Sequence, residues 1–277
     1  MSVCILLINS KRQVTDKRSI MKKWMLLIAL AIPLVTSAKE LNRIHGYEDS
    51  YVLGTYTDEL NKDTYVDGGF EDADGLQQVE VKFQFSLAVP IMPINQSTSV
   101  MFAYTQKSLW QLGNNDISSP FRETNYKPQF FLMHQSNMLI FNNAEIGYVH
   151  ESNGQTASLS RSWDRMYGAL ERIDGPVQYG FRAWYVFADE TPDEDMTDYL
   201  GDYDVWVKLG NDIGQFNTRF HYNFGTNKGG AEAGYTLYLN KFVGLYVQAW
   251  KGYGETLIDY NHDQTRIGLG MKLIPPN

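Results

Sequence analysis

The chain has 277 residues, of which 14 % are aromatic and one is cysteine, and it carries a formal net charge of −8 at pH 7. A chain this acidic lacks the basic surface that nucleic-acid binding requires, so we expect no nucleic acid among its partners. The single cysteine, Cys4, excludes intramolecular disulfides and any cysteine-based metal or redox site.

The N-terminal region is predicted to be absent from the mature protein. Residues 21–38 have a basic start, an apolar middle and small residues at the end, which is the pattern of a secretory signal peptide. Their apolar stretch is too short to cross a bilayer as a helix. Residues 1–20 show mixed charges without periodicity, so we interpret them as a non-native or mis-assigned extension before a true start at Met21. The mature chain, residues 39–277, then has 18 Lys and Arg against 31 Asp and Glu, a net charge of about −13.

Beyond residue 38, apolar and polar side chains alternate in one segment after another. In residues 79–89 every odd position is apolar and most even positions are polar or small, which is a strong strand signal. The longest uncharged run, residues 83–106, contains Pro90 and Pro93, so it does not read as one spanning helix. About twelve strand segments are predicted, near residues 50–57, 78–90, 97–110, 124–134, 138–152, 159–171, 177–188, 200–210, 214–225, 230–239, 243–251 and 264–274.

This spacing predicts an all-β fold, a single transmembrane antiparallel β-barrel of about twelve strands in the bacterial outer membrane. The polar face of the segments holds charged residues such as Glu80, Lys82 and Arg266. Such residues suit a watery or charge-paired barrel interior better than the core of a soluble β-sandwich or lipocalin-like barrel. We expect residues 39–277 to form this one domain and the barrel assembly machinery to insert it.

A base and a nucleophile, His150 and Ser152, lie two residues apart on the fifth predicted strand and therefore project from the same face. That face continues the apolar parity of Ile146 and Tyr148 and is predicted to point at lipid, where an unsatisfied polar group is costly. On the sixth strand, Asp164 has the outward parity, and antiparallel pairing would bring it within reach of His150. Together they have the residue types of a serine hydrolase, with Ser152 as nucleophile, His150 as general base and Asp164 orienting the imidazole. The expected substrate is an acyl ester in the membrane.

Strand parity also predicts the orientation of the barrel. Both termini of an even-stranded barrel lie in the periplasm, so connections that leave odd-numbered strands are extracellular. His150 and Ser152 are then at the outer-leaflet end of strand five. Three loops are predicted to be extracellular, at residues 111–123, 153–158 and 189–199.

Longer motifs around these residues resemble a known family. The run His150-Glu-Ser-Asn-Gly154, followed by residues 160–165, resembles the signature of outer membrane phospholipase A, a twelve-stranded barrel that cleaves phospholipids with calcium. The resemblance covers most of the mature chain and implies a phospholipase of A1/A2 type that also accepts lysophospholipids. Asp164 stands where the best-known members have asparagine. Further matching runs lie at residues 104–108, 118–126, 252–255 and 257–261.

The same resemblance implies roles for further residues. A backbone amide near Gly154 would assist at the oxyanion, while Ser160 would give a hydroxyl and Gln155 a backbone carbonyl to a calcium ion. Ser118 would give a hydroxyl from the neighbouring subunit, so that one ion per active site is shared across a homodimer. We choose Asp193 as a further ligand in the acidic run at 189–195. Calcium prefers six to eight oxygen ligands, so water would complete the site.

Gln106 has the outward parity of Val100 and Phe102, which places an amide among lipid-facing side chains. In hydrocarbon such an amide is stabilised by a partner, most simply its copy across a two-fold axis. The resemblance agrees, because the matching glutamine lies in the homodimer interface. Activity would then be gated by association. Alternatively, Gln106 is an ordinary polar residue at headgroup level.

Two other functions remain open at this point. In a porin or a structural barrel, His150 and Ser152 would be incidental. A lipid A deacylase would also use an outward histidine and serine two residues apart, although those enzymes resemble shorter, eight-stranded barrels.

Overall fold

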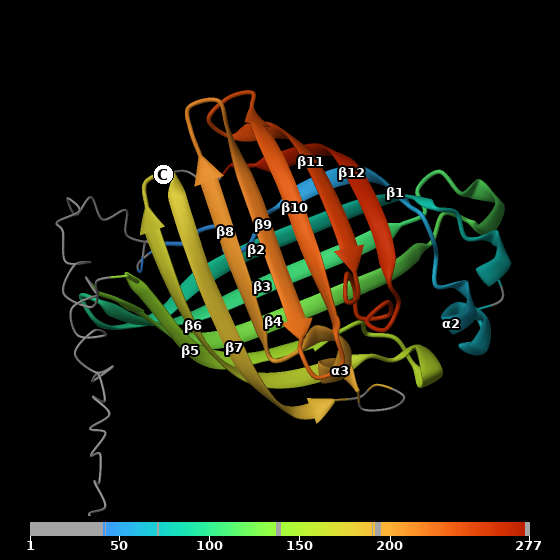
Figure 1. Ribbon diagram of the computed structural model, residues 1–277, viewed down its shortest axis with the longest axis horizontal. Coiled ribbons are helices and arrows are strands. Elements are labelled where there is room, and N and C mark those ends of the chain that lie inside the picture. The colour runs from blue at the N-terminus through green and yellow to red at the C-terminus, as the bar shows by residue number, and fades with distance from the viewer. Residues whose placement is uncertain are drawn as a thin grey trace, which may run out of the picture. The chain divides into compact units, whose positions relative to one another are not determined.

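The computed structural model describes Leu41 and residues 43–70, 72–136, 140–189, 191 and 195–274. The predicted extension 1–20 and signal peptide 21–38 lie outside these residues. The described residues belong to one compact unit, Thr36–Asn277. Its strands form a closed barrel of twelve in which neighbours along the chain pair antiparallel and β1 pairs with β12 (Figure 1). The all-β barrel predicted from the alternation is therefore confirmed.

The strands are β1 (Tyr51–Thr57), β2 (Val79–Asn95), β3 (Thr98–Trp110), β4 (Phe121–Gln135), β5 (Asn143–Ser152), β6 (Ser162–Asp174), β7 (Val177–Asp189), β8 (Tyr203–Gly210), β9 (Gly214–Asn223), β10 (Lys228–Tyr238), β11 (Val243–Gly252) and β12 (Gln264–Leu273). The connections contain two short α-helices, α2 (Lys62–Asp67) and α3 (Met196–Leu200), and three 3-10 turns, η1 (Ala73–Gly75), η2 (Asn115–Ile117) and η3 (Ala157–Leu159). Among the described residues, no helix is both long and apolar enough to cross a bilayer.

Some strand bounds differ from the predicted segments. β2 continues to Asn95, beyond the expected end at Pro90. Its pairing with β3 shifts register next to Pro90 and again next to Pro93, and irregular positions of this kind tolerate residues without an N–H group. β6 begins at Ser162, later than expected, because η3 occupies the preceding residues.

Side chains alternate between the interior and the exterior of the barrel. On β1, buried residues at odd positions alternate with exposed residues at even positions. On β12, Arg266 is 2 % exposed, whereas the neighbouring Ile267 and Leu269 are 57 % and 56 % exposed. The interior therefore carries charge and the exterior is apolar, as the predicted membrane location requires.

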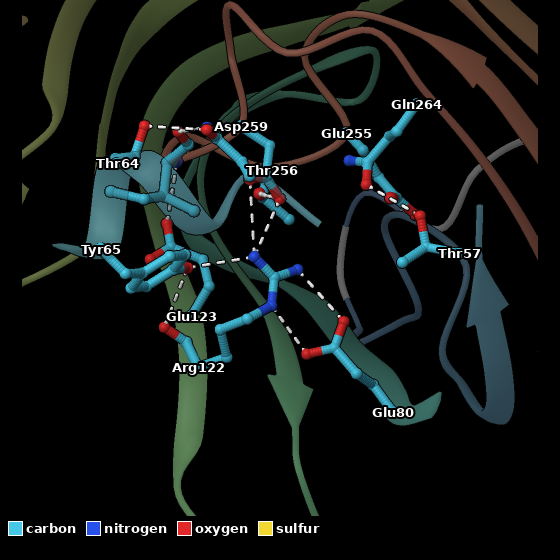
Figure 2. A network of polar contacts seen from close by, with 12 residues as sticks. Thr57, Thr64, Tyr65, Glu80, Arg122, Glu123, Glu255, Thr256, Asp259 and Gln264 are labelled. Carbon is cyan, nitrogen blue, oxygen red and sulfur yellow. Dashed lines mark hydrogen bonds and ion pairs between the residues drawn. The ribbon is translucent and has the colours of Figure 1, made fainter. Parts of the chain in front are cut away.

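One group of interior charges is centred on Arg122 of β4. Its guanidinium donates to Glu80 on β2 through Nε at 2.7 Å and Nη2 at 3.1 Å. Nη1 lies 3.1 Å from an Asp259 carboxylate oxygen and 3.0 Å from the hydroxyl of Tyr65, which comes from α2. Figure 2 shows the guanidinium between the two carboxylates, with the tyrosine beside it. This arrangement ties α2 and the β11–β12 connection to the barrel wall.

The β11–β12 connection, residues 253–263, is called the inward loop here because its residues from Glu255 to Tyr260 are buried. Glu255 accepts from Lys82 Nζ and from Arg266 Nε, each at 2.8 Å. Burial raises the pKa of Glu255, but Arg266 and Lys82 together outweigh this and lower that pKa to about 2. Glu255 is therefore ionised at neutral pH and compensates two buried cations.

We predict that Glu255→Gln lowers the free energy of unfolding by about 3–5 kcal/mol, because it leaves Lys82 and Arg266 without this compensating charge. Urea unfolding of the barrel reconstituted in lipid vesicles measures the change. The control is Asp263→Asn on the same loop, whose ion pair with Lys251 is exposed. Loss of such a surface pair is expected to cost about 0–1 kcal/mol. Equal effects of the two substitutions would contradict a stabilising role of the buried charges.

Candidate active site

The pairing of β5 with β6 places His150 directly opposite Asp164. The two side chains meet, with His150 Nδ1 2.8 Å from Asp164 Oδ1. Even-numbered residues of β5 face the exterior, since Ile146 is 60 % exposed while Val149 is 2 % exposed. His150 and Asp164 are both partly exposed on this outer surface. A hydrogen-bonded imidazole and carboxylate therefore lie on the side of the barrel that faces the membrane.

A third side chain, Tyr148, joins this pair on the same face of β5. Its hydroxyl donates to Asp164 Oδ1 at 2.6 Å, the same oxygen that contacts His150. The tyrosine ring also lies beside Phe187 of β7, with ring centroids 6.0 Å apart. Asp164 Oδ1 is thus hydrogen-bonded to both Tyr148 and His150, which are neighbours on the outer face of β5.

Ser152, the predicted nucleophile, ends β5 and lies opposite Ser162 of β6, with its side chain partly exposed. The hydrogen bonds of the described residues join His150 to Asp164 and not to Ser152. Because Nδ1 is engaged by Asp164, Nε2 is the ring nitrogen left for the serine. Bonds between a nucleophile and its base are often long before substrate binds, so this geometry is compatible with catalysis.

The barrel interior also contains a cavity of about 220 Å³, lined mainly by polar and charged residues that include Glu151 and Arg165. Its described lining includes neither His150 nor Ser152. The cavity is therefore distinct from the candidate site, which opens on the outer surface.

The loop after Ser152, residues 153–161, is closed by the side chain of Asn153, which is 3 % exposed. Asn153 Oδ1 accepts from the backbone N–H groups of Gln155, at 3.3 Å, and Arg161, at 2.9 Å. Asn153 Nδ2 donates to the Leu159 carbonyl at 2.8 Å and to Glu123 at 3.4 Å. A single buried amide thus holds both ends of the loop and connects it to β4.

This loop carries three residues with predicted roles. Gly154 has a φ of +64°, in the left-handed region that favours glycine, and a Cβ there would lie 3.2 Å from the Tyr126 ring. Gln155 is exposed and Ser160 is partly exposed. The glycine therefore permits the turn between Asn153 and Gln155.

The remaining predicted ligands belong to a different connection or lie outside the described residues. Ser118 follows η2 in the β3–β4 connection, is exposed and has a φ of +64°. Asp193 lies outside the described residues. The roles given to Ser118 and Asp193 therefore stay predictions.

Gln106, the predicted interface residue, already has partners within β3. Its Oε1 accepts from the Tyr104 hydroxyl at 3.1 Å, and its Nε2 donates to Ser108 Oγ at 3.3 Å. A glutamine amide has two N–H groups and a carbonyl with two lone pairs, so these bonds use half of its capacity. A second subunit is thus compatible with this geometry but is not required to satisfy the amide.

Sequence reasoning did not single out Asn153 or the hydroxyl of Tyr148. An Asn-Gly pair directly after a strand favours a side-chain-to-backbone turn, and this signal could have identified Asn153. Tyr148 was assigned only by its apolar parity, because the pattern does not show where a phenol hydroxyl lies.

Comparisons with known proteins agree with this geometry. The family model described as Phospholipase A1 matches residues 34–273. Phospholipase A1 of Escherichia coli K12 is 41 % identical over 238 residues, which cover 83 % of this chain and 81 % of the relative. The solved structure of outer membrane phospholipase A from Escherichia coli has a TM-score of 0.78 and 39 % identity, covering 82 % of this chain and 93 % of that one. A calcium-bound dimer of the Salmonella typhi outer membrane phospholipase has a TM-score of 0.79 and 37 % identity, covering 83 % and 92 %. The chain therefore belongs to the phospholipase A1 family and is an outer-membrane β-barrel enzyme.

Proposed function

We propose that this chain is a calcium-dependent phospholipase that hydrolyses acyl esters of phospholipids, of A1/A2 type and including lysophospholipids, and that becomes active as a homodimer. The observation that carries the proposal is the hydrogen bond between His150 Nδ1 and Asp164 Oδ1 on the exterior of the barrel. His150 precedes Ser152 by two residues on β5, so the two side chains share this face. An acyl ester that reaches this site is already in the membrane, so the enzyme does not have to extract it.

In the acylation step, Ser152 Oγ attacks the ester carbonyl while His150 Nε2 takes the hydroxyl proton. Asp164 holds Nδ1 and stabilises the imidazolium that forms. The backbone N–H near Gly154 donates to the carbonyl oxygen as negative charge develops on it. Collapse of the tetrahedral intermediate breaks the ester bond, and His150 returns the proton to the departing alcohol oxygen of the lysophospholipid.

In the deacylation step, His150 takes a proton from water, which attacks the acyl carbon on Ser152. The ester to the serine breaks, the fatty acid leaves and Ser152 recovers its proton. The same base therefore serves both halves of the reaction, and its orientation by Asp164 matters in each.

The residues assigned to calcium fit that ion by their chemistry. Ser118, Gln155 and Ser160 offer hydroxyl and carbonyl oxygens, the hard ligands calcium prefers, and all three are at least partly exposed. The ion, when bound, supplies positive charge that stabilises the developing oxyanion. The calcium-bound dimer of the Salmonella typhi relative supports the choice of calcium and of a dimer. One ion per site, with Ser160 and Gln155 from one subunit and Ser118 from the other, is part of the proposal.

The active site is proposed to face the outer leaflet. It lies at the end of β5 that leads into the 153–161 loop, and connections after odd-numbered strands are extracellular when both termini are periplasmic. Phospholipid that reaches this leaflet would then be the substrate. Insertion of the barrel by the barrel assembly machinery is part of the same proposal.

We predict that Ser152→Ala abolishes phospholipid hydrolysis while the barrel still folds, because no other group replaces the attacking oxygen. Fatty-acid release from mixed micelles, with calcium or with a chelator, measures this. The parent should release fatty acid only with calcium, and Ser97→Ala, in the β2–β3 turn, should behave like the parent. Undiminished hydrolysis by Ser152→Ala would reject the proposed function.

We also predict that Asn153→Ala raises the calcium concentration for half-maximal hydrolysis about tenfold. Its amide closes the loop with Gln155 and Ser160, and unsatisfied buried groups cost about 1–3 kcal/mol each. The calcium-induced rise in melting temperature, which should shrink, provides a second measurement. The control is Asn240→Ala in the β10–β11 turn. The Asn240 side chain accepts hydrogen bonds from the backbone N–H groups of Phe242 and Val243. An unchanged calcium requirement would show that Asn153 does not position the site.

We predict that Gln106→Ala lowers dimer content and hydrolysis together, because it removes an outward amide able to bond across a subunit interface. Sedimentation in detergent and fatty-acid release, measured on the same samples, test this. Phe216→Ala is the control, since it shortens an outward side chain on β9, six strands from β3 around the barrel. A loss of dimers with full activity retained would contradict gating by association.

A further inference from the structure

The carboxylate of Asp164 is contacted from two sides by side chains of β5. Tyr148 and His150 lie two residues apart on the exterior face, and each reaches Asp164 Oδ1, at 2.6 Å and 2.8 Å. We propose that Tyr148 is a positioning residue of the catalytic triad, whose hydroxyl fixes the Asp164 carboxylate in the orientation that holds the His150 imidazole. This inference rests on the proposed function, because it assigns a role within that site.

The backbone alone does not orient the carboxylate. Strand pairing fixes the Cα and Cβ positions of Asp164 opposite His150. Rotation of the carboxyl group about its last bond is broad and roughly two-fold, so pairing leaves the direction of its oxygens open. A second donor on the same oxygen restricts this rotation. Tyr148 supplies that donor from a position fixed by the same strand as His150.

The lipid-facing location increases the importance of this bond. A carboxylate only accepts hydrogen bonds, and on a surface next to hydrocarbon few water molecules are available to donate to it. Charge-assisted hydrogen bonds are roughly twice as strong as neutral ones. The phenol therefore supplies Asp164 with a hydrogen-bond donor where few water molecules can do so.

The phenol is itself held in place by packing. The Tyr148 ring lies beside the Phe187 ring of β7, with centroids 6.0 Å apart and planes inclined by 32°. β6 runs between β5 and β7, so this contact spans the strand that carries Asp164. The hydroxyl consequently approaches the carboxylate from a defined direction.

The test begins with Tyr148→Phe, which removes the hydroxyl and keeps the ring. We expect kcat to fall about tenfold with KM unchanged, which corresponds to about 1.4 kcal/mol, because the hydrogen bond from the hydroxyl to the carboxylate is lost. The rate at which an alkylsulfonyl fluoride modifies Ser152 should fall by the same factor. Tyr235→Phe, at an outward tyrosine of β10, should leave both rates unchanged.

A double-mutant cycle decides whether Tyr148 acts through Asp164. In an Asp164→Ala background the hydroxyl has lost its acceptor, so adding Tyr148→Phe should change kcat by no more than about twofold. If the two single effects multiply instead, Tyr148 acts independently of Asp164 and the proposal is overturned. Phe187→Leu loosens the packing of the ring but keeps the hydroxyl. Because this packing acts by placing the hydroxyl, Phe187→Leu should lower kcat by no more than Tyr148→Phe does. A larger loss would show that the ring contact matters by itself, which would overturn the proposal.

Ser152→Ala, assayed alongside, separates two kinds of failure. If Ser152→Ala is inactive and Tyr148→Phe behaves like the parent, only the role of Tyr148 is wrong. If Ser152→Ala remains active, the proposed function itself fails. Melting temperatures of all variants, measured in the same detergent, identify any that do not fold.

Discussion

A polar side chain that faces hydrocarbon has to find its hydrogen-bonding partners within the protein, because the membrane interior offers no water. The candidate site satisfies this constraint across a single strand pair. His150 and Tyr148 of β5 both contact the Asp164 carboxylate of β6, on the exterior face. The partners that make these side chains tolerable next to lipid are the same ones that orient the imidazole for its proposed role in proton transfer.

The buried charges inside the barrel also find their partners within the protein, because ions of opposite sign lie next to one another. Arg122 bridges Glu80 and Asp259, while Glu255 compensates two cations at the base of the inward loop. This charged interior reaches the site through Glu123, which accepts from the Ile258 N–H of the inward loop and from the Asn153 amide. The loop beside the proposed nucleophile is therefore supported from within the barrel by Glu123 of β4.

Period-two alternation was sufficient to predict the closed barrel, because a strand with one apolar and one polar face has few other stable arrangements in a membrane. It also predicts that His150, Ser152 and Asp164 share the outer face. It could not predict the contacts of Asn153, since these join loop backbone groups whose positions depend on tertiary structure. Alternation correctly places Gln106 on the outer face, but it does not show that the amide has partners on its own strand. An outward amide is therefore not by itself evidence for a subunit interface. Family resemblance, rather than pattern, identified the calcium ligands, and those assignments stay predictions.

The pairing of β5 with β6 has a consequence for biogenesis. A slip of one residue in strand register turns every side chain of the slipped strand to the opposite face. Asp164 would then point into the lumen, away from the imidazole that it contacts in the correct pairing. A barrel that closes in the wrong register would therefore lose the contact between His150 and Asp164 on which the proposed triad depends. In the proposed mechanism, hydrolysis is thereby coupled to correct assembly of the barrel.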